Sequence, residues 1–199
     1  MQVMDEQKRL KILKAAARLF ATQPFHKVLL SDVAEEAAVG KGTLYIYFKN
    51  KEDLFLSVLC NGISRLSAHL QERMDEETNT PMGNLEMIVR EIVGFAYEKP
   101  HLFEVIRMIP NWDSANRAEW ESRRKDFRYL IETVIRKGME QGYFEDTHPQ
   151  LTAKYIPGLV RSALLDGIDT IDREVLTDHI LGFIKKAIIV KEAPCRKNG

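Results

Sequence analysis

The sequence lacks the features that define several common classes of protein. Its only two cysteines, Cys60 and Cys195, lie far apart with no metal-ligand or redox spacing, which argues against a disulfide framework and favours a reducing compartment. No apolar run approaches the roughly 18 residues of a membrane-spanning helix, and the N-terminus lacks the apolar stretch of a signal peptide. We therefore expect a soluble, cytoplasmic protein with no membrane partner.

Signatures of enzymes and metal sites are also missing. Residues 40–42 lack the strand and the spacing of a phosphate-binding loop, and no Gly-x-Ser-x-Gly nucleophile turn occurs. Glu98 and His101 have the Glu-x-x-His spacing of bundle iron sites, but a bundle site needs two such motifs, and Pro100 interrupts the helix. We predict no enzymatic activity, no catalytic residue, no metal site and no cofactor.

The formal net charge is zero, so overall basicity does not indicate a nucleic-acid partner. The distribution of charge is more informative. Residues 1–51 carry nine Lys and Arg against five Asp and Glu, whereas the other 148 residues carry 20 against 24. A basic segment followed by an acidic one is the asymmetry expected of a DNA-binding protein.

Apolar residues recur at helical spacing through most of the chain, and no alternating run predicts a strand. In the first helix we assign Leu10, Leu13 and Phe20 to the buried face. The sequence therefore predicts an all-α fold. Besides the two short helices described next, helices are expected over residues 5–22, 51–77, 82–97, 100–110, 113–141, 150–169 and 175–190.

Two short helices joined by a tight turn are predicted within residues 30–51. Val33, Ala34, Ala37 and Ala38 fall on one face of the first helix, and their small side chains allow a second helix to cross closely. The valine and glycine that follow break this pattern. The segment therefore has the organisation of a helix-turn-helix.

The second short helix, residues 41–48, carries the groups that indicate function. Leu44 and Phe48 can pack inward, which leaves a cation, a hydroxyl and two phenols on the other faces, with no acidic residue over 41–51. Such groups bind phosphate oxygens and base edges, and Gly42 allows close backbone approach. The residues expected to contact DNA are Ser31, Lys41, Gly42, Thr43, Tyr45, Tyr47 and Lys51.

This motif resembles the DNA-binding signature of the TetR (tetracycline repressor) family. The resemblance covers about the first quarter of the chain and departs from the family pattern at three positions. Leu29 stands where a capping threonine is common, and Pro24 and Ala38 stand where glycine is common; Ser31 is the candidate to replace the missing hydroxyl. The matching residues are 33–34, 37, 39, 41–45, 47–48 and 51–54.

The resemblance implies an N-terminal three-helix DNA-binding domain, residues 1–51, and a C-terminal helical bundle for ligand binding and dimerisation, residues 52–199. It further implies a ligand-responsive transcriptional repressor that binds a palindromic operator as a homodimer and is released by a small apolar or amphipathic effector. The expected ligand-pocket residues are Phe95, Phe103, Met108, Trp112, Trp120, Phe127 and Tyr155. The expected dimer interface consists of Leu159, Ala163, Gly167, Ile180, Phe183 and Ile184.

Two alternatives remain open at this level. The chain could be an all-α enzyme or interaction bundle in which the helix-turn-helix serves only for packing. The pocket residues, taken singly, are equally compatible with ordinary core packing. Specific DNA binding with a steep salt dependence separates the regulator from the first alternative.

Overall fold

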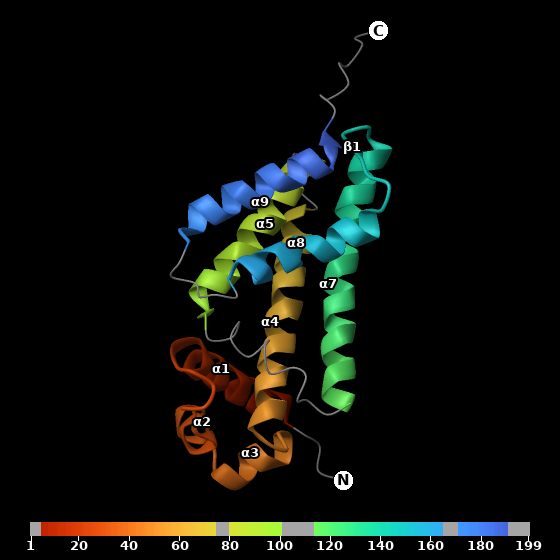
Figure 1. Cartoon of the computed structure of the whole chain (residues 1–199). Helices are drawn as coiled ribbons and strands as arrows, with labels where there is room; N and C mark the ends of the chain where they lie inside the picture. Colours follow the sequence, from red (N-terminus) through yellow and green to blue (C-terminus); the bar gives the residue numbers. More distant parts are fainter. Residues whose placement is uncertain (1–4, 75–79, 101–113, 165–170, 191–199) are drawn as a thin grey trace. The chain divides into compact units, whose positions relative to one another are not determined.

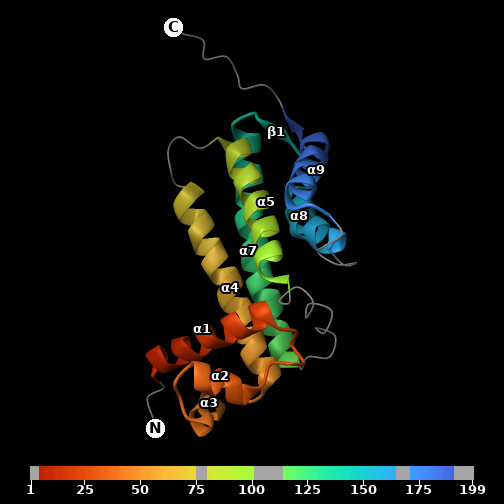
Figure 2. The same cartoon turned by 90° about the vertical axis from the view of Figure 1, so that its left-hand side faces the viewer.

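The computed structural model describes residues 5–74, 80–100, 114–164 and 171–190 (Figures 1 and 2). Its helices confirm the all-α prediction; of the helix expected over residues 100–110, all but the first residue lie outside the described residues. The helices are α1 (Glu6–Thr22), α2 (Leu30–Glu36), α3 (Lys41–Tyr47), α4 (Lys51–Met74), α5 (Pro81–Glu98), α7 (Ser114–Glu140), α8 (Pro149–Ala163) and α9 (Arg173–Ala187).

One feature departs from the sequence prediction, which contained no strand. β1 (Phe144–Glu145) and β2 (Ile189–Val190) pair in antiparallel fashion, with Phe144 opposite Val190. Each strand has two residues, which is too short for an alternating pattern to be visible in the sequence.

The chain forms two compact units. Unit 1 comprises residues 1–64 and 98–123, and unit 2 comprises residues 65–97 and 124–199. The helices α4 and α7 each continue from one unit into the other. The domain boundary predicted after residue 51 stays a prediction.

The helix α1 supplies much of the core of unit 1. It begins where the Asp5 carboxylate accepts hydrogen bonds from two backbone N–H groups of the first turn. Leu13 and Phe20 are buried as predicted, together with Ile12 and Ala15. Leu10 was expected on this face but is 41% exposed. The buried face is centred on Ile12 and Ala16, so Leu13 lies at one edge of it and Leu10 lies beyond that edge.

An aromatic cluster joins α1 to α4 within unit 1. The ring centroids of Phe20 and Phe55 lie 4.8 Å apart in an edge-to-face arrangement, and Phe25 meets Phe55 at 5.2 Å. Phe20 and Phe25 stack with their ring centroids 5.8 Å apart. All three distances fall in the range of favourable aromatic contacts. The cluster packs the start of α4 against α1 and the segment that follows α1.

In unit 2, the end of α7 shows why two glycines occur four residues apart. Gly142 has φ +76°, and the backbone N–H of Tyr143 donates to the carbonyl of Gly138 at 2.8 Å, so the helix ends in a left-handed cap. The ring of Phe144 is 2% exposed and packs where a Cβ on Gly138 would lie. One glycine therefore serves conformation and the other serves packing.

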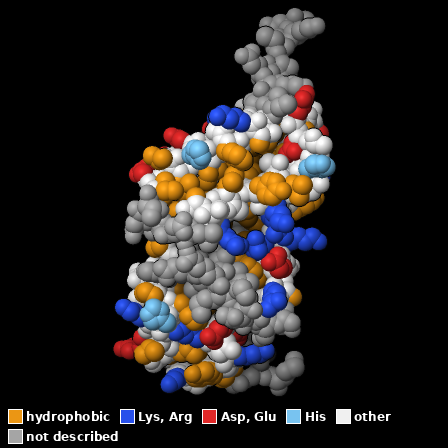
Figure 3. Space-filling view, viewed as in Figure 1, with side chains coloured by type: hydrophobic (Ala, Val, Ile, Leu, Met, Phe, Trp, Pro, Cys, Tyr) orange, Lys and Arg blue, Asp and Glu red, His pale blue; other side chains and the backbone are white. Residues whose placement is uncertain are grey.

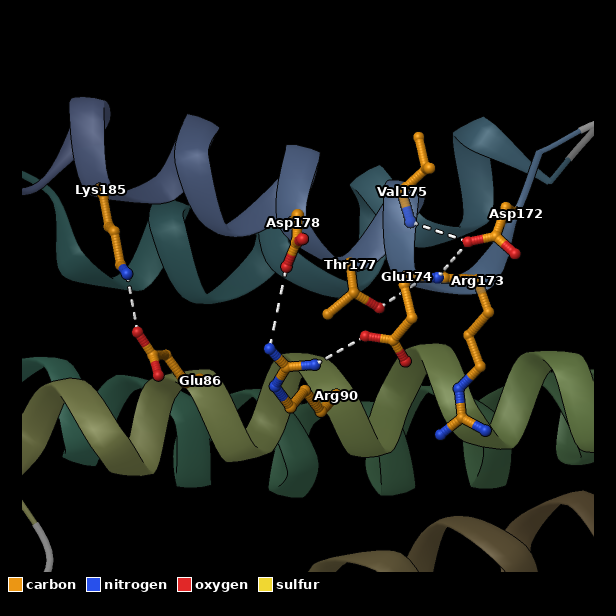
Figure 4. Close-up of polar contacts among 9 residues, drawn as sticks. All are labelled: Glu86, Arg90, Asp172, Arg173, Glu174, Val175, Thr177, Asp178 and Lys185. Atoms are coloured by element: carbon orange, nitrogen blue, oxygen red, sulfur yellow. Dashed lines mark hydrogen bonds and ion pairs between the residues drawn. The ribbon is translucent and has the colours of Figure 1, made fainter.

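The helix α9 lies along α5 (Figure 4). Arg90 pairs with Glu174 at 3.1 Å and with Asp178 at 3.8 Å, while Lys185 pairs with Glu86 at 2.7 Å. These side chains are partly exposed, so each pair contributes little to stability. The main contribution comes from the buried apolar face of α9, which consists of Leu176, Ile180, Leu181 and Ile184.

The turn between α2 and α3 contains a conformation that alanine adopts at a cost. Ala38 has φ +52°, the left-handed region in which alanine is disfavoured by about 1–2 kcal/mol. Ala38→Gly should therefore raise the free energy of unfolding by about 0.5–1 kcal/mol, after the entropic cost of glycine of about 0.5–1 kcal/mol is subtracted. Urea denaturation at fixed protein concentration measures this difference.

The neighbouring residue provides the matched control. Ala37 has φ −81° and is 6% exposed, so Ala37→Gly removes a buried methyl group and gains no conformational relief. It should lower the denaturation midpoint. An Ala38→Gly variant that is less stable than the wild type would contradict the strain at this turn.

Candidate DNA-binding surface and dimer face

The helix α3 is held in unit 1 by the two apolar side chains that the sequence pattern placed inward. Leu44 is 0% exposed, and Phe48, the residue at the C-cap, is 1% exposed. The guanidinium carbon of Arg9 lies 5.6 Å from the centre of the Phe48 ring, so α1 covers this end of α3. The inward packing of Leu44 and Phe48 is confirmed.

The outer face of α3 is open to solvent. Lys41 and Gly42 are exposed and Tyr45 is 50% exposed, while Thr43 is partly buried. These four residues remain candidates for DNA contact. Ile46, which is 58% exposed on the same helix, was not among the predicted residues, because the pattern favoured groups that donate or accept hydrogen bonds.

Tyr47 is placed differently from its neighbour Tyr45. Its side chain is partly buried, and its phenolic oxygen accepts a 3.1 Å hydrogen bond from the backbone N–H of Asp5. The contact links the end of α3 to the start of α1, so Tyr47 positions the helix. A contact of Tyr47 with DNA stays a prediction. No sequence pattern indicates this partner, which lies 42 residues away.

The start of α2 lacks the capping hydroxyl that is common in similar motifs. Leu29, at the N-cap, makes no side-chain hydrogen bond and is 57% exposed. Ser31 is exposed, and its hydroxyl lies 3.2 Å from Oδ1 of Asp32, to which it donates. Ser31 therefore does not cap α2, and its contact with a phosphate stays a prediction.

The start of α4 is fixed by a reciprocal pair of hydrogen bonds. Asn50 Oδ1 accepts from the backbone N–H of Asp53, and Asp53 Oδ2 accepts from that of Lys49, both at 2.8 Å. Lys51 opens the helix with Nζ 4.5 Å from the centre of the Phe25 ring. Burial lowers the pKa of Lys51, because it disfavours the charged ammonium. A DNA phosphate beside the ammonium would have the opposite effect and favour the charged form.

A second accessible surface lies on α8 and α9 in unit 2. Tyr155, Val175 and Phe183 are 57%, 61% and 54% exposed, and a Cβ added to Gly158 or Gly182 would meet no atom within 4 Å. Hydrophobic side chains gather over these two helices in Figure 3. We call the surface formed by these five residues the α8–α9 face.

The residues predicted for the dimer interface differ in their exposure on α9. Ile180 and Ile184 are 3% and 2% exposed and pack into the core of unit 2, so they do not lie on an accessible surface. Phe183, also a predicted interface residue, is 54% exposed and lies beside Gly182 on the α8–α9 face, and the interface itself stays a prediction. On α8, Leu159 and Ala163 are partly exposed, and Gly167 lies outside the described residues.

Comparison with known proteins decides the family. Residues 12–58 match the sequence model of bacterial regulatory proteins of the tetR family, and residues 78–164 match that of the tetracyclin repressor-like C-terminal domain. The chain is 33% identical over 140 residues to the fatty acid metabolism regulator protein of Bacillus subtilis (strain 168), which covers 70% of this chain and 72% of that protein. The chain belongs to the TetR family.

Solved structures agree with this assignment. FadR from Bacillus subtilis in complex with stearoyl-CoA has a TM-score of 0.74 at 20% identity and covers 90% of this chain and 98% of its own. A transcriptional regulator from Saccharomonospora viridis in complex with choline has a TM-score of 0.78 at 20% identity and covers 94% and 100%. At this identity the likeness shows the TetR fold. The protein is thus a TetR-family transcriptional regulator.

The ligand pocket expected in this TetR-family chain is only partly within the described residues. Trp120 and Phe127 are 4% and 7% exposed, Phe95 is partly buried, and Tyr155 is exposed on the α8–α9 face rather than inside unit 2. The pocket stays a prediction. The expected pocket residues that lie outside the described part of the chain are Phe103, Met108 and Trp112.

Cys60 is a buried free cysteine in the described part of the chain. Among the described residues, no group of three or more His, Cys, Asp or Glu side chains could hold a metal ion. None of the described helices is long and apolar enough to cross a membrane. Burial, aided by the Glu119 carboxylate, raises the pKa of the Cys60 thiol to about 12. A thiol with this pKa holds almost no reactive thiolate near neutral pH.

The two tyrosines of α3 should respond differently to substitution. Tyr45→Ala removes an exposed ring and should weaken specific DNA binding at least about fivefold, roughly 1 kcal/mol, with an unchanged unfolding midpoint. Tyr47→Phe keeps the ring but removes the acceptor for the Asp5 N–H, and should cost about 0.5–1.5 kcal/mol of stability. Fluorescence anisotropy with labelled DNA and urea denaturation separate the two effects. Wild-type DNA affinity in Tyr45→Ala would exclude this residue from the interface.

Proposed function

We propose that this TetR-family regulator is a cytoplasmic repressor that binds a palindromic operator as a homodimer and is released by an amphipathic effector. The main observation that supports DNA binding is how α3 packs in unit 1. Burial of Leu44 and Phe48 leaves Lys41, Gly42 and Tyr45 on the outside. A short helix that presents a cation, a phenol and a bare backbone position suits the major groove.

The α8–α9 face supports the homodimer. A contiguous exposed apolar surface marks a binding site in a soluble protein, and a second copy of the same face would cover it in an isologous contact. Gly158 and Gly182 would let the facing helices approach closely, while Phe183 and Tyr155 would fill the space beside them. The two α3 helices of the dimer would then read half-sites about 34 Å apart.

The relatives support an effector with a long apolar chain. The 33% identical protein is named a fatty acid metabolism regulator, and one structural neighbour holds stearoyl-CoA. An acyl thioester combines an apolar chain, suited to buried aromatic residues such as Phe127, with a polar head. The choline found in the other neighbour makes a small quaternary amine the second candidate.

Release from DNA requires that the effector bind the DNA-incompetent arrangement more tightly than the competent one. The helix α4 runs from the unit that contains α3 into the unit that contains α8 and α9. We therefore propose α4 as the element whose displacement couples the two functions. The coupling free energy expected for such regulators is about 1–3 kcal/mol.

One experiment tests operator and effector together. Selection of random duplex DNA by the full-length protein should yield a palindrome with half-site centres about 10 base pairs apart. Stearoyl-CoA should then weaken operator binding about 5- to 150-fold, whereas coenzyme A alone and choline should have no effect. Release by choline but not by stearoyl-CoA would transfer the effector role to the quaternary amine. Retained DNA with no common sequence would contradict the repressor itself.

The dimer has its own test. Phe183→Asp places a charge on the α8–α9 face, where it would be buried without a partner in the dimer. The variant should be a folded monomer that has lost specific operator binding. Tyr129→Asp is the control, because Tyr129 is 70% exposed on α7, outside this face, and the variant should remain dimeric. Light scattering at micromolar concentration distinguishes the outcomes, and a monomeric wild type would refute the dimer.

A further inference from the structure

Ile46 is, after Val175, the most exposed of the large aliphatic side chains that the structure describes, and it lies towards the end of the helix proposed to read DNA. Its exposed fraction of 58% compares with 0% for Leu44, two residues earlier. Single exposed apolar residues are common. This one is notable because it shares its helix with the proposed DNA-contacting groups.

Helix geometry fixes the direction of this side chain. Successive residues of an α-helix are rotated by about 100°, so a residue two positions after Leu44 points to nearly the opposite side. Leu44 faces the core, and Ile46 therefore faces directly away from it. Gly42, one turn earlier on the same outer side, has no atom within 4 Å of the position of a Cβ, so the helix surface is open there. The outer face thus combines an aliphatic side chain with an open backbone position one turn away.

The chemistry of an isoleucine side chain restricts what it can recognise. It has no donor or acceptor, so it cannot bind a phosphate or the polar edge of a base. In the major groove, the 5-methyl group of thymine is the apolar feature that distinguishes one base from the others. A β-branched side chain in a helix is nearly fixed at χ1, so little conformational entropy is lost when it makes contact.

We propose that Ile46 is a specificity-determining residue that reads the 5-methyl group of one thymine in each operator half-site. The inference rests on the proposed function, since it requires α3 to enter the major groove. Under this proposal Ile46 selects thymine at one operator position through its methyl group, which the hydrogen-bonding residues of α3 cannot recognise by a hydrogen bond. Close approach is possible because the glycine one turn earlier leaves room for the edge of the base.

Replacement of thymine by deoxyuridine tests the inference, because it removes only the methyl group. In the operator selected by the full-length protein, each thymine is replaced in turn, symmetrically in both half-sites. One such replacement should weaken wild-type binding about 15-fold, which is about fourfold per half-site for a buried methyl group of about 0.8 kcal/mol. Ile46→Ala should bind the thymine and deoxyuridine operators equally well.

Leu29→Ala is the matched control. Leu29 is also aliphatic and 57% exposed in unit 1, but it lies at the N-cap of α2, so this variant should keep the full 15-fold discrimination. Denaturation midpoints equal to the wild type establish that both variants fold, as expected for exposed side chains.

The outcomes separate this inference from the proposed function. If no sequence is selected from random DNA, both fail. If an operator is found but no deoxyuridine replacement weakens binding, or if Ile46→Ala keeps the same penalty, only the reading of thymine by Ile46 is overturned.

Discussion

The position of α3 depends on the burial of two side chains. The helix has seven residues, and isolated helices shorter than about 12–15 residues are marginal in water. Leu44 and Phe48 therefore hold it in place, with about 1.5–3 kcal/mol available from each fully buried side chain. Because these two residues supply the buried side chains, the exposed positions of α3, such as Tyr45 and Ile46, are not needed for its packing. Their composition is free to serve recognition, which explains why an exposed isoleucine and tyrosine can stand next to each other there.

The same division of labour governs α9. Its buried row sets the orientation of the helix on α5, and the ion pairs at its edge are too exposed to do so alone. Thr177, 1% exposed, donates to the carbonyl of Arg173 at 2.8 Å, so even the polar member of the buried row is satisfied within the helix. Because α9 is held rigidly, Gly182 and Phe183 are exposed in a fixed geometry. A preorganised surface of this kind favours binding to a specific protein partner, since little entropy is lost on association.

Apolar periodicity was enough to predict the helices and the inward role of Leu44, because this signal is local. It does not show which residues face the core when two faces of one helix are both apolar. On α9, Ile180 and Phe183 have similar hydrophobicity, and only the packing in unit 2 shows that the first is inside and the second outside. The hydrogen bond of Tyr47 could not be predicted either, because its partner, Asp5, lies 42 residues earlier in the chain and such a contact leaves no periodic pattern in the sequence.

The restraints on α3 also limit how an effector can act. In the turn before α3, the N–H groups of Ala38 and Val39 bond to the carbonyls of Glu35 and Ala34 at the end of α2, each at 2.9 Å. Its end is held by the phenol of Tyr47, and the capping pair fixes the turn into α4. A helix restrained at both ends pays little ordering entropy on binding DNA. It is correspondingly hard to deform, so under the proposed function an effector would act by changing the separation of the two α3 helices of the dimer and not the structure of either helix. Since α4 is continuous through both units, a shift of that helix as a rigid rod would suffice.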